Sequence, residues 1–385
     1  MSELFMAGKG TRRDFLARSS SLLGAGLLGT AETKAATTKG PHDFVIVEGH
    51  RDIWELSGRM RLPDKEQHTP ITNFLTPRLI EAGLSVVIMP ASGDSLDERD
   101  GMQGMFEGSM RVLDMILSDM EKSKGKSSII LTKADVPTRP NVGKVQYFLD
   151  IEGGGAIQTE MPEPGFSPER YLSLLRQFFR LGVRGVQLTH NGRNQLGDGR
   201  GIDKMGSKLT PFGVQVIGEM NRLGMMVGVS HLSANGLFHA AEVSKQPIVS
   251  THQNLERFVK SKPLVEIMDE EAVAIAKTGG IVGIRYIVGV TPYKLLVDEV
   301  EYLAKLIGPE HIGVGWLGHD KANPNSGEIE GYTKKTYSGV EVQTMQEHWQ
   351  TFISMLSERG LTDEHIGMVL GGNYLRVWNQ VLPPA

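Results

Sequence analysis

The sequence predicts an α/β fold, a (β/α)8 TIM barrel, on three observations. Short β-rich runs recur through most of the 385 residues, and a helical pattern follows each of them. No Pro/Gly/Ser-rich linker and no internal repeat divides the chain. Polar residues of the kinds that bind metals stand where the strands end, which is where such barrels place their chemistry. We therefore expect a single barrel domain over residues 39–385.

The eight strand candidates set this prediction. In chain order they are Phe44–Val47, Ser85–Met89, Gln146–Ile151, Gly185–Thr189, Met225–Val229, Pro247–Ser250, Gly280–Tyr286 and His311–Gly315. Parallel strands need a crossover helix between them, so this alternation indicates a parallel sheet. A closed barrel is the natural arrangement for eight such units, and a doubly wound open sheet is the alternative. The polar, Gly-rich stretch Gly192–Gly206 is expected to form a long loop over the site.

Two helices have readable ends. Thr210 is a typical N-cap, Pro211 suits the first helical position, and Gly224 is a typical stop. A second helix is expected to be capped by Asp269 and to run to Lys277, before Gly279.

Residues 1–38 have the order of a signal peptide. The pair Arg12 and Arg13 precedes a short, weakly polar run, Ser19–Gly29, and small residues follow it. The Arg pair favours twin-arginine export, and so a bacterial periplasmic enzyme that meets that export machinery. A disordered leader with a chance Arg pair is the alternative. Without cysteine there is no lipoprotein anchor.

Composition excludes several classes of function. The formal net charge of −4 gives no reason to expect nucleic-acid binding. No apolar run approaches the ~20 residues that span a bilayer, so no stable membrane anchor is expected. The absence of cysteine excludes disulfides, thiolate zinc sites and a Cys nucleophile. A transition-metal site must therefore use His, Asp and Glu, and the chain has 11 His.

Ligand-type residues follow several strands. His50 and Asp52 close the first strand and, being two apart, face the same side. A lone His after a strand is usually a surface or structural residue, but here the placement repeats. Four more candidates each end a different strand, the third to the sixth: Glu152, His190, His231 and His252.

Imidazoles and carboxylates at this density need a cation to offset their desolvation. A nitrogen and oxygen ligand set without thiolate suits Zn²⁺ or a similar divalent ion. Six ligand positions suit two metals better than one. A bridging carboxylate and a bridging hydroxide would then serve a two-metal hydrolysis.

At these residues the chain resembles the membrane (renal) dipeptidase family of zinc peptidases, family M19. The similarity covers nearly all of the chain after the leader. It is carried by Thr76–Leu79 with Gly83, by Leu181–Arg184 leading to Leu188–Asn191, by Leu209–Gly213 and Met220–Gly224 through to Val229–Ser233, and by Gly371–Asn373 with Leu375–Val377.

The resemblance implies two zinc ions per chain and, by position, five ligands. His50 and Asp52 would bind one ion, and His231 and His252 would bind the other. Glu152 would bridge the two ions. His190 would contact the substrate carbonyl and stabilise the tetrahedral intermediate, and Tyr286 would line the pocket. The resemblance also implies a homodimer.

The chain departs from the family pattern at two places. The family's eighth strand ends in an Asp that handles the proton, and Leu317 occupies that position here; Asp320 or His319 is the candidate replacement. The family's carboxylate-binding Arg after strand six has no clear counterpart. The basic candidates there are Arg257, Lys260 and Lys262.

The sequence therefore predicts a metallo-hydrolase that cleaves an amide in a small dipeptide-like substrate. His190 and Asp320 are its candidate catalytic residues, and Arg257 is a candidate for the substrate carboxylate. The first alternative is the same binuclear site acting on a lactone or a non-peptide amide. The second is a metal-binding barrel that has lost catalysis and serves as a binding protein.

Overall fold

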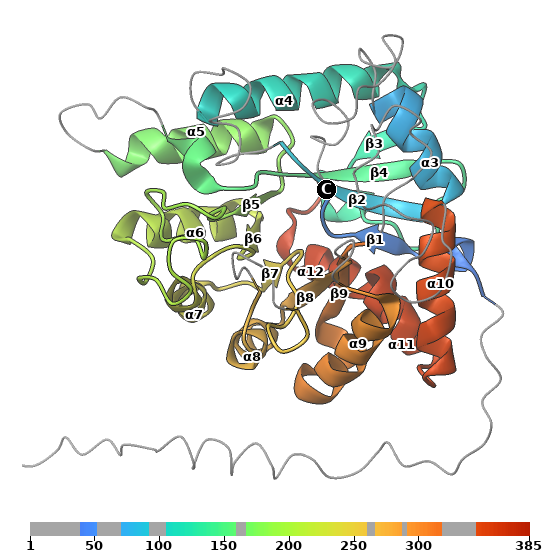
Figure 1. The fold of residues 1–385 in the computed structure, drawn as a ribbon. Coiled ribbons are helices and arrows are strands. Elements are labelled where there is room, and N and C mark those ends of the chain that lie inside the picture. Colours follow the sequence, from blue (N-terminus) through green and yellow to red (C-terminus); the bar gives the residue numbers. More distant parts are fainter. Residues whose placement is uncertain are drawn as a thin grey trace, which may run out of the picture. The chain divides into compact units, whose positions relative to one another are not determined.

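A computed structural model of the chain describes residues 39–51, 71–91, 105–158, 167–259, 266–286, 291–317 and 344–385 (Figure 1). The chain divides into two units, Met1–Ala36 and Thr37–Ala385, and every described residue belongs to the second. The expected signal peptide lies outside the described residues. Within the described ranges, no helix combines the length and the apolar character that a bilayer crossing requires.

Nine strands alternate with helices in the described part of the chain. The strands are β1 (Ile46–Glu48), β2 (Leu84–Pro90), β3 (Ser127–Ile129), β4 (Val145–Asp150), β5 (Gly185–Gln187), β6 (Met226–Gly228), β7 (Ile248–Ser250), β8 (Ile281–Arg285) and β9 (Ile312–Trp316). The helices are α3 (Thr76–Glu81), α4 (Met105–Met120), α5 (Pro168–Arg180), α6 (Pro211–Leu223), α7 (Ala234–Val243), α8 (Asp269–Lys277), α9 (Tyr293–Ile307), α10 (Met345–Glu358), α11 (Asp363–Gly367) and α12 (Asn373–Val381).

The strands form two parallel sheets whose edges meet. Their orders are β1-β2-β4-β3 and β5-β6-β7-β8-β9, and every strand pair is parallel. At one seam Ile151 N donates to Gly185 O at 3.2 Å, and at the other Gly49 N donates to Val314 O at 2.9 Å. The strands β1, β2, β4 and β5 to β9 therefore follow one another around a ring. This confirms the barrel and excludes the open doubly wound sheet.

The sequence patterns located the ends of the eight predicted strands to within two residues. Each of the eight predicted strands overlaps an observed one, whereas the short strand β3 was not predicted. Helix α6 has the predicted ends: the Thr210 hydroxyl accepts from Gly213 N at 3.0 Å, and Gly224 has a φ of 76°. The predicted cap of α8 is wrong by one residue, since Met268 is the N-cap and Asp269 is the first helical residue.

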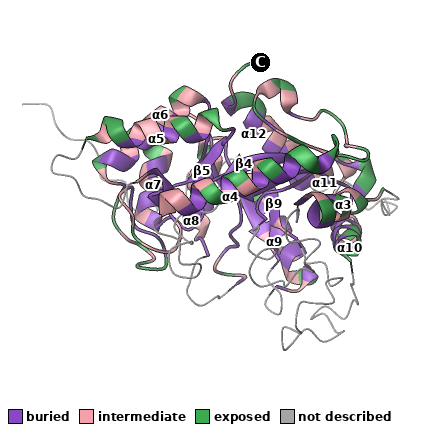
Figure 2. Ribbon diagram, turned by 90° about the horizontal axis from the view of Figure 1, so that it is seen from above, coloured by how far each residue is buried: buried purple, intermediate pink, exposed green. Residues whose placement is uncertain are grey.

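Apart from β3, the strands are almost wholly buried, and the surrounding helices bury the faces that pack on them (Figure 2). Tyr374 of α12 packs beneath the site in one buried cluster with side chains of β1, β2, β4 and β6 to β8, and its hydroxyl donates to the Thr251 carbonyl at 3.3 Å. Glycine is required where this ring passes: a Cβ at Gly49 or Gly283 would lie 2.1 or 2.7 Å from the Tyr374 oxygen. The closing helix thus supports the strand end that carries His252.

Candidate metal centre

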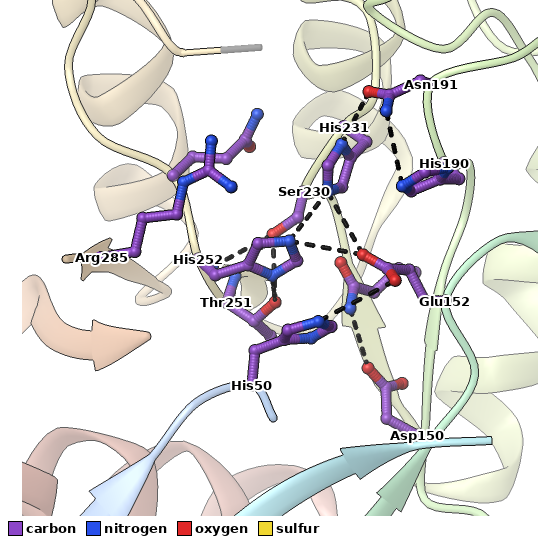
Figure 3. A network of polar contacts seen from close by, with 12 residues as sticks. His50, Asp150, Glu152, His190, Asn191, Ser230, His231, Thr251, His252 and Arg285 are labelled. Atoms are coloured by element: carbon purple, nitrogen blue, oxygen red, sulfur yellow. Dashed lines mark hydrogen bonds and ion pairs between the residues drawn. The ribbon is translucent and has the colours of Figure 1, made fainter. Parts of the chain in front are cut away.

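The barrel brings five predicted site residues together at the carboxyl ends of its strands (Figure 3). They arrive from β1, β4, β5, β6 and β7, in the order His50, Glu152, His190, His231 and His252. Two groups lie close enough for each to hold an ion: His50 with Glu152 and His252, and Glu152 with His190 and His231. Asp52, His319 and Asp320 lie outside the described residues.

Glu152 stands between two sets of imidazoles and shares its oxygens between them. Its Oε2 faces His50 Nε2 at 3.9 Å. Its Oε1 faces His231 Nε2 at 3.2 Å and His252 Nε2 at 3.3 Å. The side chain is buried. Glu152 follows β4 by two residues, and its backbone pairs with Gln187 of β5 across the seam. This is the geometry that a bridging carboxylate needs.

Neighbouring groups orient the two imidazoles of the second sheet. The Asn191 Oδ1 accepts from His231 Nδ1 at 2.9 Å, and because an amide oxygen cannot donate, the proton of neutral His231 is on Nδ1. His252 Nδ1 lies 2.8 Å from the Thr251 hydroxyl, which in turn contacts Ser230 Oγ at 3.1 Å. Both imidazoles therefore present Nε2 to the centre, as metal ligands with such outer partners do.

A cation fits this arrangement, and the protein atoms alone do not satisfy it. The Nε2 atoms of His231 and His252 face each other at 2.8 Å. The His231 Nε2 lone pair also faces the Glu152 carboxylate, which only accepts hydrogen bonds. Lone pairs that converge in a buried site repel each other unless a positive charge lies among them. The donor set therefore points to a divalent ion at this place.

Protonation in the site agrees with metal binding. Burial alone would raise the pKa of Glu152, but His50, His231 and His252 hold it well below its usual value. Burial lowers the pKa of His231 to about 4, against an opposing effect of Glu152. Burial, with the charge of His50, also places the pKa of His252 well below 6.5. An ionised carboxylate beside neutral imidazoles is the ligand state that a metal requires.

His190 follows β5 and lies against the cluster. Its ring centroid is 4.6 Å from that of His231, with the planes at 48°. The Asn191 Nδ2 approaches His190 Nε2 at 3.4 Å, so one amide side chain contacts both rings. This contact favours the tautomer of His190 protonated at Nδ1, which is a hydrogen-bond donor. A ring nitrogen of His190 also lies within ligand range of Glu152 and His231.

A buried ion pair holds the end of β1. Arg51 donates to both oxygens of Glu48, from Nε at 2.5 Å and from Nη2 at 2.8 Å. Glu48 also accepts from the backbone N of Leu317 at 3.2 Å, which ties β1 to the end of β9. The Leu317 side chain is buried, at the strand end where the family carries its Asp.

The loop after β5 is built onto the strand end that carries His231. His231 has a φ of 64°, in the left-handed region that non-glycine residues seldom occupy. Arg200 N donates to the His231 carbonyl at 2.6 Å, and its buried guanidinium pairs with Glu271. Gly199 pairs with Leu232 in an antiparallel bridge. Contacts from the stretch Gly192–Gly206 therefore hold the backbone of His231 in its strained conformation.

Tyr286 and Arg257 are the residues predicted to contact the substrate, and the structure describes their neighbours. Tyr286 is buried beside Tyr293, with ring centroids 5.2 Å apart and planes at 19°. The side chain of Arg257 is 47% exposed, lies 3.5 Å from Asp269 and stacks 4.2 Å from the Tyr302 ring centroid. The described contacts thus join Arg257 to α8 and α9. The arginine beside the metal cluster is Arg285 (Figure 3).

Several residues of the site were not predicted. Arg285 ends β8 and lies on the side of His231 and His252 (Figure 3). The rule that strand ends carry the chemistry would have found it. Asp150, whose pKa burial raises to about 7, accepts from Gln187 Nε2 at 3.2 Å beneath the cluster. No spacing signal distinguishes these interior residues, or Asn191 and Thr251, from ordinary strand residues.

The chain is similar to known proteins in its sequence and in its fold. The family model for membrane dipeptidase (peptidase family M19) matches residues 41–383. Dipeptidase 3 of Mus musculus is 27% identical over 359 residues, which is 88% of this chain and 65% of the mouse protein, so the chain spans about two thirds of that relative's length. An amidohydrolase from Pseudomonas aeruginosa has 20% identity and a TM-score of 0.67, covering 89% of this chain and 99% of its own. A metallopeptidase from Rhodobacter sphaeroides, liganded with a phosphinate mimic of L-Ala-D-Ala, has 16% identity and a TM-score of 0.69, covering 88% and 99%. The match over nearly the whole barrel shows that this chain belongs to the membrane dipeptidase family, peptidase family M19.

Proposed function

We propose that this chain is a zinc-dependent dipeptidase that hydrolyses the amide bond of a small dipeptide-like substrate. Two zinc ions per chain would be held by His50, Asp52, Glu152, His231 and His252. One observation carries this proposal: the Glu152 carboxylate offers one oxygen to His50 and the other to His231 and His252. A shared carboxylate between two imidazole sets suits a binuclear centre.

The chain's own groups orient the reaction. Bound zinc supplies a Lewis acid for the scissile carbonyl and a water that ionises near neutral pH. Asn191 fixes the tautomer of His231, and Thr251 contacts Nδ1 of His252, so that each imidazole keeps its Nε2 toward the centre during turnover. His190 donates a hydrogen bond to the oxygen that becomes negative in the tetrahedral intermediate.

The departing amine needs a proton, since an amide anion leaves poorly. We assign this role to Asp320, which lies three residues after Leu317 in a segment that begins with Gly318. Asp320→Asn should leave the metal content unchanged and lower kcat ~10²-fold or more, within the range for lost acid–base help. A wild-type rate in this variant, with a severely impaired His319→Ala, would transfer the role to His319.

A second candidate function is hydrolysis of a lactone or a non-peptide amide by the same centre. It is favoured by Leu317, a buried apolar residue at the strand end where the family has its proton-handling Asp. A lactone releases an alkoxide, which needs less help from an acid than an amine does. Faster hydrolysis of a lactone or a non-peptide amide than of any dipeptide would favour this candidate, and a strong preference for the dipeptide would exclude it.

A panel of dipeptides tests the proposal with the zinc-loaded protein. We expect hydrolysis that chelation abolishes and zinc restores, with about two metals per chain by elemental analysis. Metal binding without turnover of any dipeptide, lactone or amide would favour the alternative of a binding protein. A chain that takes up no divalent metal would contradict all three readings.

We also propose that the chain is exported to the bacterial periplasm by the twin-arginine machinery and acts there as a homodimer. Arg12→Lys together with Arg13→Lys should retain the precursor in the cytoplasm, because that route depends on the pair itself. Normal periplasmic accumulation of the double variant would contradict the export route. Sedimentation of the purified protein tests the dimer.

A further inference from the structure

Arg285 lies at the edge of the metal centre. It is the last residue of β8, where it pairs with Trp316 of β9, and its side chain is only 15% exposed. Figure 3 shows it on the side of the cluster held by His231 and His252. A guanidinium thus stands on the side of the centre that carries His231 and His252.

One partner holds this guanidinium in place. Arg285 Nη2 donates to Glu266 Oε1 at 2.9 Å. Glu266 is itself anchored, because its Oε2 accepts from Asn254 N at 2.8 Å and its carbonyl accepts from Arg200 Nη1 at 3.0 Å. Asn254 Oδ1 in turn accepts from Arg285 N at 3.3 Å. The arginine is therefore preorganised by groups that the metal ligands do not use.

The guanidinium keeps hydrogen-bonding capacity that the described protein atoms leave unfilled. Arg285 Nε is buried and has no hydrogen-bond partner among the described residues. A buried donor without an acceptor is unfavourable, which makes such a group a candidate for ligand binding. A guanidinium offers five donors in a planar fork, and Glu266 engages one edge of it. The unfilled donors suit a second planar anion, such as a carboxylate.

We propose that Arg285 binds the free carboxylate of the substrate, and that Glu266 is the positioning residue for its guanidinium. This inference rests on the proposed dipeptidase function and narrows its substrate. The preferred substrate carries a carboxylate on the residue immediately after the scissile bond, on the β8 side of the centre. Recognition would then come from β8, whereas Arg257 after β7 is engaged by Asp269 and Tyr302.

Binding of two matched probes to the zinc-loaded full chain tests this assignment. The probes are the phosphinate mimic of L-Ala-D-Ala and the same compound with its carboxylate converted to a carboxamide, compared by titration calorimetry. Wild type should bind the carboxylate form about 10- to 100-fold more tightly, as expected for hydrogen bonds between charged groups. Arg285→Met should lose this preference, and its affinity for the carboxamide should change less than about 3-fold.

Three further variants separate recognition from folding. Arg285→Lys keeps the charge without the fork and should retain an intermediate preference. Arg257→Met is the matched control and should keep the full preference. Glu266→Gln should weaken the carboxylate form alone and, in turnover, raise KM more than it lowers kcat, which a general loss of stability would not do. Unchanged zinc content in each variant shows that the site is intact.

The outcomes distinguish this inference from the proposed function. Full preference in Arg285→Met, or its loss in Arg257→Met instead, overturns the role of Arg285 while leaving dipeptide hydrolysis in place. Equal wild-type affinity for the two probes also overturns it. A preference that depends on Arg285, in a chain that cleaves no dipeptide, supports carboxylate recognition and contradicts the dipeptidase proposal.

Discussion

The two sheets of the barrel hold their shares of the metal centre by different means. In the five-stranded sheet, neutral side chains orient the ligands: Asn191 contacts His231, and Thr251 contacts His252. In the four-stranded sheet, the strand end beside His50 is held by a buried ion pair between Glu48 and Arg51. Losing a neutral partner alters ligand orientation, whereas losing one ion leaves a buried charge unpaired. The five-stranded sheet should therefore govern metal affinity, and the four-stranded sheet should govern stability.

Removing a ligand from the five-stranded sheet should have the largest effect. His231→Ala is expected to remove one metal and most activity, because the remaining groups cannot complete that half of the centre. Elemental analysis and dipeptide turnover measure both changes. His365→Ala, a partly buried His of α11 outside the cluster, is the control and should change neither. Full metal content in His231→Ala would refute the ligand assignment.

Breaking the ion pair of the four-stranded sheet should reduce stability. Arg51→Met leaves Glu48 charged and buried, a change that typically costs about 3–5 kcal/mol. Denaturant unfolding of the metal-free protein measures this loss. The double variant Glu48→Gln, Arg51→Met should recover part of it, since no unpaired charge remains. Equal stability of the single and double variants would show that the pair does not act through charge.

A His190 variant tests whether this residue stabilises the oxyanion or binds a metal ion. If it stabilises the oxyanion, His190→Ala should keep both metals and lower kcat by ~10²–10³, the usual loss for one such donor. Its position within ligand range of Glu152 and His231 makes the metal content decisive. A drop in bound metal would make His190 a ligand, and an unchanged kcat would make it structural.

Removing the neutral partners of the imidazoles should give the smallest effects. These variants test most directly whether the five-stranded sheet governs metal affinity rather than stability. Thr251→Val and Asn191→Leu each remove a hydrogen bond to an imidazole that faces the centre. We expect ~10- to 100-fold weaker metal binding from each, the usual range for outer partners of ligands. Unfolding of the metal-free variants should stay close to wild type. A large loss of stability without any change in affinity would reverse the distinction between the sheets.

Prediction from sequence succeeded where a local pattern has one structural meaning. The cap at Thr210 and the stop at Gly224 depend on their own hydrogen bond and φ, so they were found correctly. Strand β3 was missed because its run Ser127–Ile129 is short, partly polar and paired with only one neighbour. Asp269 was misplaced by one residue, because Asp is common both at the cap and in the first turn, where its charge also suits the helix dipole.

The sequence by itself determined that His50, Glu152, His190, His231 and His252 would meet. In a parallel barrel all the carboxyl ends of the strands lie at one edge, so residues at successive strand ends are brought together without any knowledge of side-chain direction. Only the tertiary structure decided which nitrogen of each imidazole faces the centre, since Asn191 and Thr251 are packing neighbours that spacing does not reveal. It also showed that Arg257 contacts groups of α8 and α9, whereas Arg285 lies beside His252 and His231. A long side chain can reach in several directions from its strand, and its position depends on its partners: Asp269 and Tyr302 for one, Glu266 for the other.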